Sequence, residues 1–335
     1  MHLSHPIPLR LRLALACALT CTLAMAPGQV LPTLAQSNLN KPIKVIVPFG
    51  PGGPTDVSAR IVAQVLQAAL AQSVVIENRP GAGGALGTKS VAAAEPDGAT
   101  LLIGTSATLG VVPALMKNPG YDPIRSFAPV AKIADSTLVL VTPASFPAGS
   151  VKEFIAYAKA NAGRLSYASA GVGNQTQLLA ELFKSKAGID VVHVPYKSGA
   201  EMVTAILSEQ VQMAFPDVSI LIPLIRERKL KALAVTSAQR HPQLPDVPTM
   251  IESGIPDYVM TFWSGVVAPA GTPAEIVEKL NGAINDGLKS PAMRDNLAKV
   301  GAQASPGSPK NFADFIVAET EKWRAVAKMA GISLD

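Results

Sequence analysis

Short apolar runs alternate with segments of helical periodicity along most of this 335-residue chain. A β-branched run at 43–47 is followed by Val57, Ile61, Val65 and Ala69, which recur every four positions. Alternation of strand-like runs with segments of helical period is typical of α/β folds that are built on a largely parallel sheet. We therefore predict an α/β protein.

The predicted strands fall into two series, and the second series begins at Ser150. The first series has strands at Ile43–Val47, Ser73–Glu77, Leu101–Gly104, Val130–Ile133 and Leu138–Val141, and the second has strands at Leu165–Ala168, Val191–Val194, Val211–Phe215 and Leu233–Val235. Capping boxes that begin at Ser150 and Thr272 predict helix starts, and Ser308 precedes a last helix from Asn311 to Ala330.

The helical C-terminal tail is too small to form a domain alone, so we expect it to pack on the first series. The chain then crosses between two lobes twice, near Ser136–Val141 and near Thr261–Val267. The predicted organisation is a signal peptide at 1–35, lobe 1 at 36–136 and 261–335, and lobe 2 at 137–260.

The first 35 residues have the layout of a secretory signal peptide. Basic residues precede an apolar run at 13–26, and no acidic residue occurs before position 36. Cleavage after Ala35 is preferred, because cleavage after Ala26 would place a proline directly behind the cut. An uncleaved anchor and a lipoprotein cut at Cys17 are the alternatives, but the apolar run is short for a membrane span. The predicted location is the periplasm.

Composition narrows the function of the mature chain. Both cysteines, Cys17 and Cys21, lie in the signal peptide, so neither a disulfide nor a cysteine-ligated metal is expected. Loss of Arg10 and Arg12 lowers the basic count from 29 to 27 against 24 acidic residues, so the net charge falls from +5 to +3. The basic residues are scattered, which argues against a nucleic-acid interface. Despite a mean hydropathy of +0.29, no later apolar stretch reaches the length of a membrane span.

Two glycine-rich segments join a predicted strand to a predicted helix. The segment "IVPFGPGGPTDVSAR" (46–60) has no lysine of a phosphate-binding loop, and the segment "SYASAGVGNQTQ" (166–177) lies in the other lobe. A third segment, "RPGAGGALG" (79–87), lacks the last glycine of a dinucleotide fingerprint. The pattern therefore gives little support for nucleotide binding.

What these loops offer is main-chain N–H groups at helix N-termini, where four donors are unpaired and a partial positive charge develops. Glycine lets a ligand approach that backbone, so we predict an anion site between two facing loops. The alternative is that the glycines only shape turns and that Thr55 or Asp56 only caps a helix.

Catalysis finds little support in the sequence. The mature chain has two histidines, His193 and His241, and no nucleophile elbow or zinc-binding helix motif. We predict neither metal nor cofactor and no enzymatic activity. An exported enzyme acting on a carboxylate, with His193 or Asp217 as base, is the rival hypothesis, and a structural protein is a third. Asp217 follows a strand and either caps a helix or points into the cleft, and Tyr196 and Lys197 either line the cleft or lie on the surface.

From Lys41 to Ile332, the chain resembles the Bug, or TctC-like, receptors of tripartite tricarboxylate transporters. The segments that carry the resemblance are Pro48-Phe49 through Gly52-Gly53 to Asp56, Glu77-Asn78-Arg79-Pro80-Gly81-Ala82-Gly83-Gly84, Pro96-Asp97-Gly98, His193-Val194-Pro195-Tyr196-Lys197 and Pro269-Ala270-Gly271-Thr272-Pro273. The resemblance implies a two-lobed periplasmic binding protein of type II, with mixed and mainly parallel sheets.

It also implies a monomer that binds a small carboxylate (a dicarboxylate, an amino acid or an aromatic acid) and delivers it to integral membrane subunits of a transporter, or presents it to a sensor. By position, the implied ligand-binding residues are Phe49, Gly52, Gly53, Pro54, Thr55, Asp56, Thr105, Ser106, Ala107, Ser169, Ala170, Gly171, Gly173, Asn174, Thr176, Tyr196 and Asp217. In that setting Asp56 either accepts a bond from a ligand amine or hydroxyl or caps its helix.

The sequence departs from the family pattern at four positions. Asn174 stands where serine is frequent, Gln177 where histidine is common, Ser198 where glycine is usual, and Ala99 where an aromatic residue is frequent. Two of these positions lie on the second glycine-rich loop, so the departures leave the identity of the ligand open.

Overall fold

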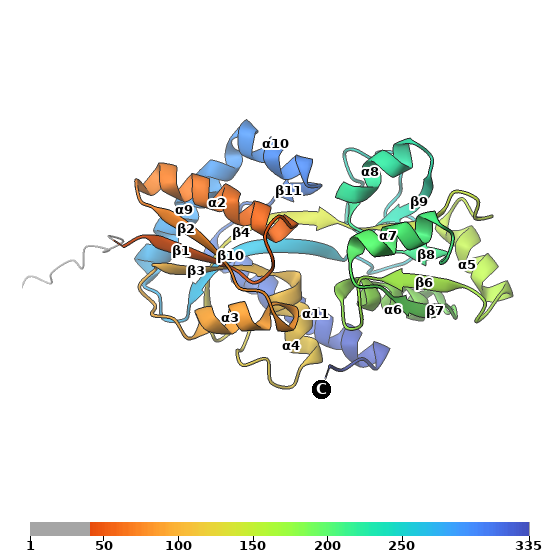
Figure 1. Ribbon diagram of the computed structural model, residues 1–335, viewed down its shortest axis with the longest axis horizontal. Helices are drawn as coiled ribbons and strands as arrows, with labels where there is room; N and C mark the ends of the chain where they lie inside the picture. Colours follow the sequence, from red (N-terminus) through yellow and green to blue (C-terminus); the bar gives the residue numbers. More distant parts are fainter. Residues whose placement is uncertain (1–40, 335) are drawn as a thin grey trace, which may run out of the picture. The chain divides into compact units, whose positions relative to one another are not determined.

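The computed structural model describes residues 41–334, which lie within one unit, Leu39–Asp335 (Figure 1). The predicted signal peptide, both candidate cleavage sites and both cysteines lie outside the described residues.

Two β-sheets organise the described chain. The first has the order β11-β4-β10-β3-β1-β2, with strands β1 (Ile43–Val47), β2 (Val74–Asn78), β3 (Thr100–Thr105), β4 (Phe127–Thr137), β10 (Thr261–Pro269) and β11 (Ala302–Ala304). The second has the order β7-β6-β8-β5-β9, with strands β5 (Val139–Pro143), β6 (Ser166–Ser169), β7 (Val192–Pro195), β8 (Met213–Ala214) and β9 (Leu230–Val235). We call the parts built on these sheets lobe 1 and lobe 2.

Helices cover both faces of each sheet (Figure 1). In lobe 1 they are α2 (Pro54–Leu70), α3 (Ala85–Ala92), α4 (Val112–Leu115), α9 (Ala274–Lys289), α10 (Pro291–Lys299) and α11 (Pro309–Ala330), with the short helices η1 (Ala82–Gly84) and η2 (Ala107–Val111). In lobe 2 they are α5 (Val151–Ala160), α6 (Gln175–Ala187), α7 (Gly199–Leu207) and α8 (Val218–Arg226).

Alternation along the strands divides each lobe into two cores, because successive side chains point to opposite faces of a sheet. In β1, Val45 and Val47 pack against α2 and α9, whereas Ile46 packs with residues of α3 and α11. In β5, Leu140 packs with α5 and α6, whereas Val141 packs with α7 and α8. Apolar residues buried on both faces explain why these strands are continuous hydrophobic runs in the sequence.

Both sheets are mixed, as predicted, but they contain more antiparallel pairing than expected. The pairs β1–β2, β1–β3, β6–β7 and β6–β8 are parallel. The long strand β10 runs antiparallel to both β3 and β4, and β5 runs antiparallel to β8 and β9. The difference arises at β4, β5 and β10, because these strands lie where the chain passes between the sheets rather than inside a simple βα repeat.

The chain leaves the first sheet after Thr137, enters the second at Val139 and returns to the first at Thr261. We propose lobe limits at 137/138 and 260/261; the first lies one residue after the limit predicted from the sequence, because Thr137 is still part of β4. Helix α11 contributes Phe312 to a lobe 1 core, and its later residue Trp323 belongs to a core cluster that contains residues of both lobes. One helix therefore joins the cores of both lobes.

Predicted helix starts can be compared with the observed ones. Ser150 and Ser308 cap α5 and α11 by accepting from the N–H groups of Glu153 and Asn311, which confirms both predictions. The capping box at Thr272 is wrong. Its hydroxyl donates to the Pro269 carbonyl instead, and the helix begins at 274 without a side-chain cap.

Candidate functional site

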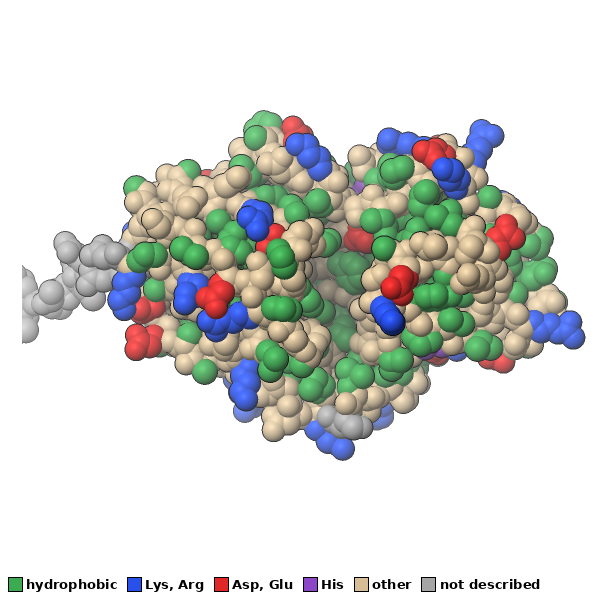
Figure 2. Space-filling view, in the orientation of Figure 1, with side chains coloured by type: hydrophobic (Ala, Val, Ile, Leu, Met, Phe, Trp, Pro, Cys, Tyr) green, Lys and Arg blue, Asp and Glu red, His purple; other side chains and the backbone are tan. Residues whose placement is uncertain are grey.

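A cleft of about 870 Å³ is lined by residues of both lobes. Figure 2 shows a hollow between the two halves of the described chain, with mostly hydrophobic and uncharged atoms inside it. The predicted ligand-binding residues that line the cleft are Phe49, Gly53, Pro54, Thr55, Thr105, Ser106, Ala107, Ala170, Gly173 and Asn174. The predicted residues that do not line it are Gly52, Asp56, Ser169, Gly171, Thr176, Tyr196 and Asp217.

The loop between β1 and α2, residues 48–53, presents open backbone to the cleft. Helix α2 starts at Pro54 with Gly53 as its N-cap, and no side chain caps it. A Cβ atom built on Gly50 or Gly53 would meet no atom within 4 Å, and Gly53 has an ordinary extended φ of −81°. The backbone conformation therefore does not require glycine at 53. What glycine preserves there is free access to the helix N-terminus, whose first-turn N–H groups have no partner within the helix.

Asp56 stabilises this first loop from the side that faces away from the cleft. Only 1% of the residue is exposed, and its carboxylate accepts hydrogen bonds from Gly52 N (3.1 Å), Arg60 Nε (2.8 Å) and Asn78 Nδ2 (3.1 Å). Burial alone would raise the pKa of Asp56, but these donors outweigh it and lower the pKa below its ordinary value. The carboxylate thus braces the loop instead of facing a ligand, which corrects its assignment as a ligand-binding residue. Gly52 is also misassigned, because its amide serves this brace and its φ of 84° shapes the turn.

The loop between β6 and α6, residues 170–174, differs from the first. Its amides at Ala170, Gly171 and Gly173 are hydrogen-bonded to the side chains of Thr176 (2.9 Å), Ser169 (3.2 Å) and Gln177 (2.8 Å). Three of the main-chain donors that were expected to serve a ligand are therefore already paired within the protein. Ser169, Gly171 and Thr176 support it from within, which explains why they do not line the cleft.

His193 also supports the loop 170–174, through Ser169 and Gln177. Its Nε2 lies 2.7 Å from Ser169 Oγ, its Nδ1 lies 3.2 Å from Gln177 Nε2, and its ring stacks on Tyr167 at 4.8 Å. Burial is the largest effect on this ring and lowers the pKa of His193 below 6.5. His193 is not among the residues that line the cleft, so its position does not favour the role of a catalytic base.

Ser106 and Gln175 connect the two lobes beside the cleft. Ser106 follows β3, and its Oγ donates to Oε1 of Gln175 at 2.7 Å. The side-chain nitrogen Nε2 of Gln175 donates to the carbonyl oxygen of Thr261 at 3.0 Å. Ser106 was predicted from the sequence and Gln175 was missed, because no local pattern announces a contact between residues 69 positions apart.

Asp217 and Tyr196 face other partners. Asp217 caps α8 by accepting from Ser219 N (2.9 Å), and it accepts from Ser136 Oγ at 2.5 Å. Its burial raises the pKa of Asp217, which the Ser136 and Ser219 bonds only partly oppose. The Tyr196 hydroxyl lies 3.4 Å from Gln210 Oε1, away from the cleft lining. Asp217 therefore takes the capping role that the sequence had left open.

Other lining residues were also missed. Among them, the strands that cross between the sheets contribute Asp135, Ser136, Phe262, Trp263 and Ser264, helix α2 contributes Ser58, and lobe 2 contributes Val172 and Ser198. Lys197, whose position the sequence had left open, lines the cleft as well. The predicted crossings at Ser136–Val141 and Thr261–Val267 were the available signal, because strands that pass between two lobes lie beside the cleft that separates them.

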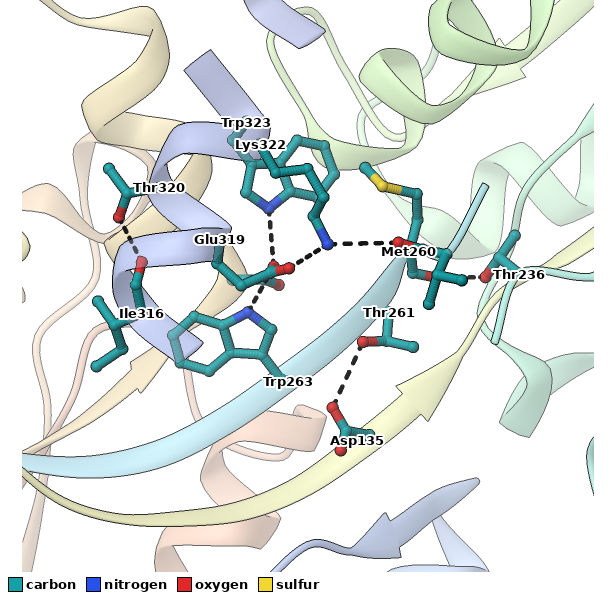
Figure 3. Close-up of polar contacts among 12 residues, drawn as sticks. Asp135, Thr236, Met260, Thr261, Trp263, Ile316, Glu319, Thr320, Lys322 and Trp323 are labelled. Atoms are coloured by element: carbon teal, nitrogen blue, oxygen red, sulfur yellow. Dashed lines mark hydrogen bonds and ion pairs between the residues drawn. The ribbon is translucent and has the colours of Figure 1, made fainter. Parts of the chain in front are cut away.

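Figure 3 shows how Trp263 is fixed beside the cleft. Its Nε1 donates to Glu319 Oε2 at 2.9 Å, and Trp323 Nε1 donates to the same oxygen at 3.2 Å. Lys322 pairs with the other oxygen of Glu319 and donates to the Val259 carbonyl at 3.3 Å. The buried carboxylate of Glu319 is thus compensated by two indoles and an ammonium group, as a charge in a protein interior requires. Helix α11 thereby fixes the start of β10.

Within residues 41–334, no group of three or more histidine, cysteine, aspartate and glutamate side chains is placed to hold a metal ion. None of the helices in this part of the chain combines the length and the apolar character needed to cross a membrane.

The two-sheet α/β architecture with an interlobe cleft defines the class: a two-lobed solute-binding protein. The chain belongs to the tripartite tricarboxylate transporter receptor family (TctC), whose pattern matches residues 58–332. This family consists of solute-binding receptors and not of enzymes, which confirms the predicted class.

Individual relatives agree over nearly the whole chain. The protein BugT of Bordetella pertussis is 38% identical over 308 residues, which is 92% of this chain and 94% of the relative. Two solved structures from Rhodopseudomonas palustris are similar: Rpa4515 with adipate (36% identity, TM-score 0.76, 87% of this chain and 98% of the other) and MatC with bound malate (34%, 0.72, 85% and 98%).

Proposed function

We propose that this receptor binds a small carboxylate in the cleft between its lobes, with one carboxylate group on the loop 48–53 and the N-terminus of α2. The observation that carries the proposal is the pair Gly50 and Gly53, where the space that side chains would occupy is empty and opens on the cleft. The first-turn N–H groups behind these glycines, together with the partial positive charge of the helix end, suit an anion.

A charged side chain of the other lobe also favours an anion. Lys197 lines the cleft and adds a positive charge from lobe 2. The relatives whose structures contain adipate and malate support a carboxylate as the ligand class. Closure of the lobes around the bound acid would stabilise the closed state by differential contact.

The proposed setting is the periplasm, and the proposed partners are the integral membrane subunits of a tripartite tricarboxylate-type transporter. Membership of the receptor family supports both.

The test is calorimetry and thermal shift with adipate and malate, together with a wider panel of organic acids. Hexane-1,6-diol is the matched control for adipate, because it keeps the chain length and the polar ends but carries no charge. We expect at least one acid to bind and to raise the Tm without being converted, and its uncharged counterpart to have no effect. Equal stabilisation by the diol would contradict carboxylate recognition, and turnover of the acid that is lost in His193→Ala would favour the enzyme.

A further inference from the structure

Gln175 lines the cleft from lobe 2. Its side-chain amide oxygen and amide nitrogen form hydrogen bonds with two separate segments of lobe 1. It is the first residue of α6 in lobe 2, and only 3% of it is exposed. Its amide oxygen accepts from Ser106 Oγ behind β3, and its amide nitrogen donates to the Thr261 carbonyl at the start of β10. Ser106 is 2% exposed, so this contact is also shielded from water.

The segment that Gln175 contacts is the return crossing of the chain. Three consecutive carbonyl groups there, at Val259, Met260 and Thr261, accept hydrogen bonds from the side chains of Lys322, Thr236 and Gln175. Figure 3 shows the anchor between Thr236 and Met260. Gln175 differs from Lys322 and Thr236 in that its second bond is made to a residue of the cleft.

We propose that Gln175 is a positioning residue that sets how closely lobe 2 approaches lobe 1, and thereby sets the affinity for the ligand. The effect on affinity rests on the proposed function, whereas the effect on the lobes does not. An amide is the group that this place requires: Ser106 needs an acceptor and the Thr261 carbonyl needs a donor. Glutamate would put an acceptor against the carbonyl, and methionine would satisfy neither partner.

Loss of the amide is expected to favour separated lobes. With the lobes together, the Ser106 hydroxyl and the Thr261 carbonyl would then be buried without partners, whereas separation lets water reach them. A ligand that needs both lobes would bind more weakly, because the binding-competent fraction of the protein would be smaller.

The test measures the distance between the lobes without ligand. The chain from residue 36 onward has no cysteine, so spin labels can be placed on Lys152→Cys in lobe 2 and Lys279→Cys in lobe 1, both of which are exposed. Pulsed electron resonance would compare the parent with Gln175→Met and Gln175→Glu. Gln64→Met is the matched control, since Gln64 is exposed on α2.

We expect longer or broader label distances in both Gln175 variants, about tenfold weaker adipate binding, and a return to the parent distance at saturating adipate. A purely structural role would not produce that return. Ser106→Ala should add little to Gln175→Met, because both variants remove the same hydrogen bond between Ser106 and Gln175. Should Gln175→Met fail to fold, Ser106→Ala and Gln175→Glu provide the same comparison.

Unchanged distances and unchanged affinity in the variants would overturn the proposal. If adipate does not bind the parent, the proposed function with this acid fails, but the distances without ligand still decide whether Gln175 positions the lobes.

Discussion

The loop before α2 and the loop before α6 look alike in the sequence, yet they are built for different purposes. Each joins a strand to a helix through glycines. At Gly53 a Cβ atom would meet nothing within 4 Å, whereas at Gly173 it would lie 2.7 Å from Leu334 Cδ2. The first glycine leaves space on the cleft, and the second makes room for another part of the protein.

Their hydrogen bonds differ in the same way. The first loop is braced from behind by Asp56, so that its front can remain open. The second loop uses its own amides to bind Ser169, Thr176 and Gln177. Glycine before a helix therefore does not by itself indicate main-chain recognition of a ligand. The two roles are distinguished by whether a side chain at the glycine would point into the cleft or into another part of the protein.

The largest expected effect is that of Gly53→Val. The side chain would project into the cleft and cover the N-terminus of α2, so adipate binding should weaken at least about 100-fold through the loss of charge-assisted bonds. Calorimetry gives the affinity and thermal unfolding gives the stability. Gly282→Val on α9 is the control, because a Cβ atom there also meets nothing within 4 Å. Unchanged affinity in the Gly53 variant would remove the first loop from the binding site.

Asp56→Ala should be the most destabilising of the loop variants. It removes a buried acceptor from Gly52, Arg60 and Asn78, and we expect a loss of about 2–3 kcal/mol in the free energy of unfolding. Urea denaturation measures this loss. Asp286→Ala, at a side chain that is 77% exposed, should change stability very little. Comparable losses in the two variants would mean that Asp56 does not brace the loop.

Gln177→Leu tests the second loop, residues 170–174. Gln177 Oε1 accepts from Gly173 N, so the variant leaves that amide without its partner and should cost about 1–2 kcal/mol. Because this amide serves the protein and not the ligand, adipate affinity should fall much less than in Gly53→Val. A loss of affinity as large as that of Gly53→Val, without a loss of stability, would show that the second loop binds the ligand directly.

Much of the fold was predictable because it is written in local patterns. The β-branched run at 43–47 predicted strand Ile43–Val47 correctly, and the hydroxyl of Ser308 caps the last helix as expected. The prediction at Thr272 was wrong because the N-cap of this helix is Pro273, and the Thr272 hydroxyl donates to the carbonyl of Pro269 in the preceding turn. The extent of antiparallel pairing was missed because it depends on where the crossing strands β4 and β10 meet, and sequence periodicity does not record that.

The candidate site was predictable to a similar degree. The first loop could be predicted as part of the cleft because the residues that form it are contiguous in the sequence. The role of Asp217 was left open in the sequence because the choice between capping α8 and facing the cleft depends on Ser136, which lies 81 positions away. Gln175 was missed for the same reason. Its partners are brought together by the two crossings of the chain, and the residue itself has no local signature.

The smallest expected effect is a difference in how the two loops respond to acid. The pKa of His193 is lowered mainly by burial; Glu181 opposes that shift and Lys184 adds to it. Because the folded pKa lies below the ordinary value of 6.5, the unfolded chain binds more protons as the pH falls through 6.5, and stability is lost. The pKa of Asp56 is also lowered, but from 3.8, so its contribution is lost only at a much lower pH. Between pH 7 and 5, acid should therefore affect the second loop and spare the first.

Urea denaturation at several pH values checks this difference. His241 also has a pKa lowered by burial, so residues 41–334 contain two such histidines and the contribution of His193 must be isolated. His193→Gln should flatten the decline in stability between pH 7 and 5 relative to the parent, because one titrating group is removed. His241→Gln is the matched control: it should flatten the same decline without altering the second loop, which exchange of the Gly173 amide would report. An identical pH profile in the parent and in His193→Gln would show that this histidine does not couple the second loop to pH.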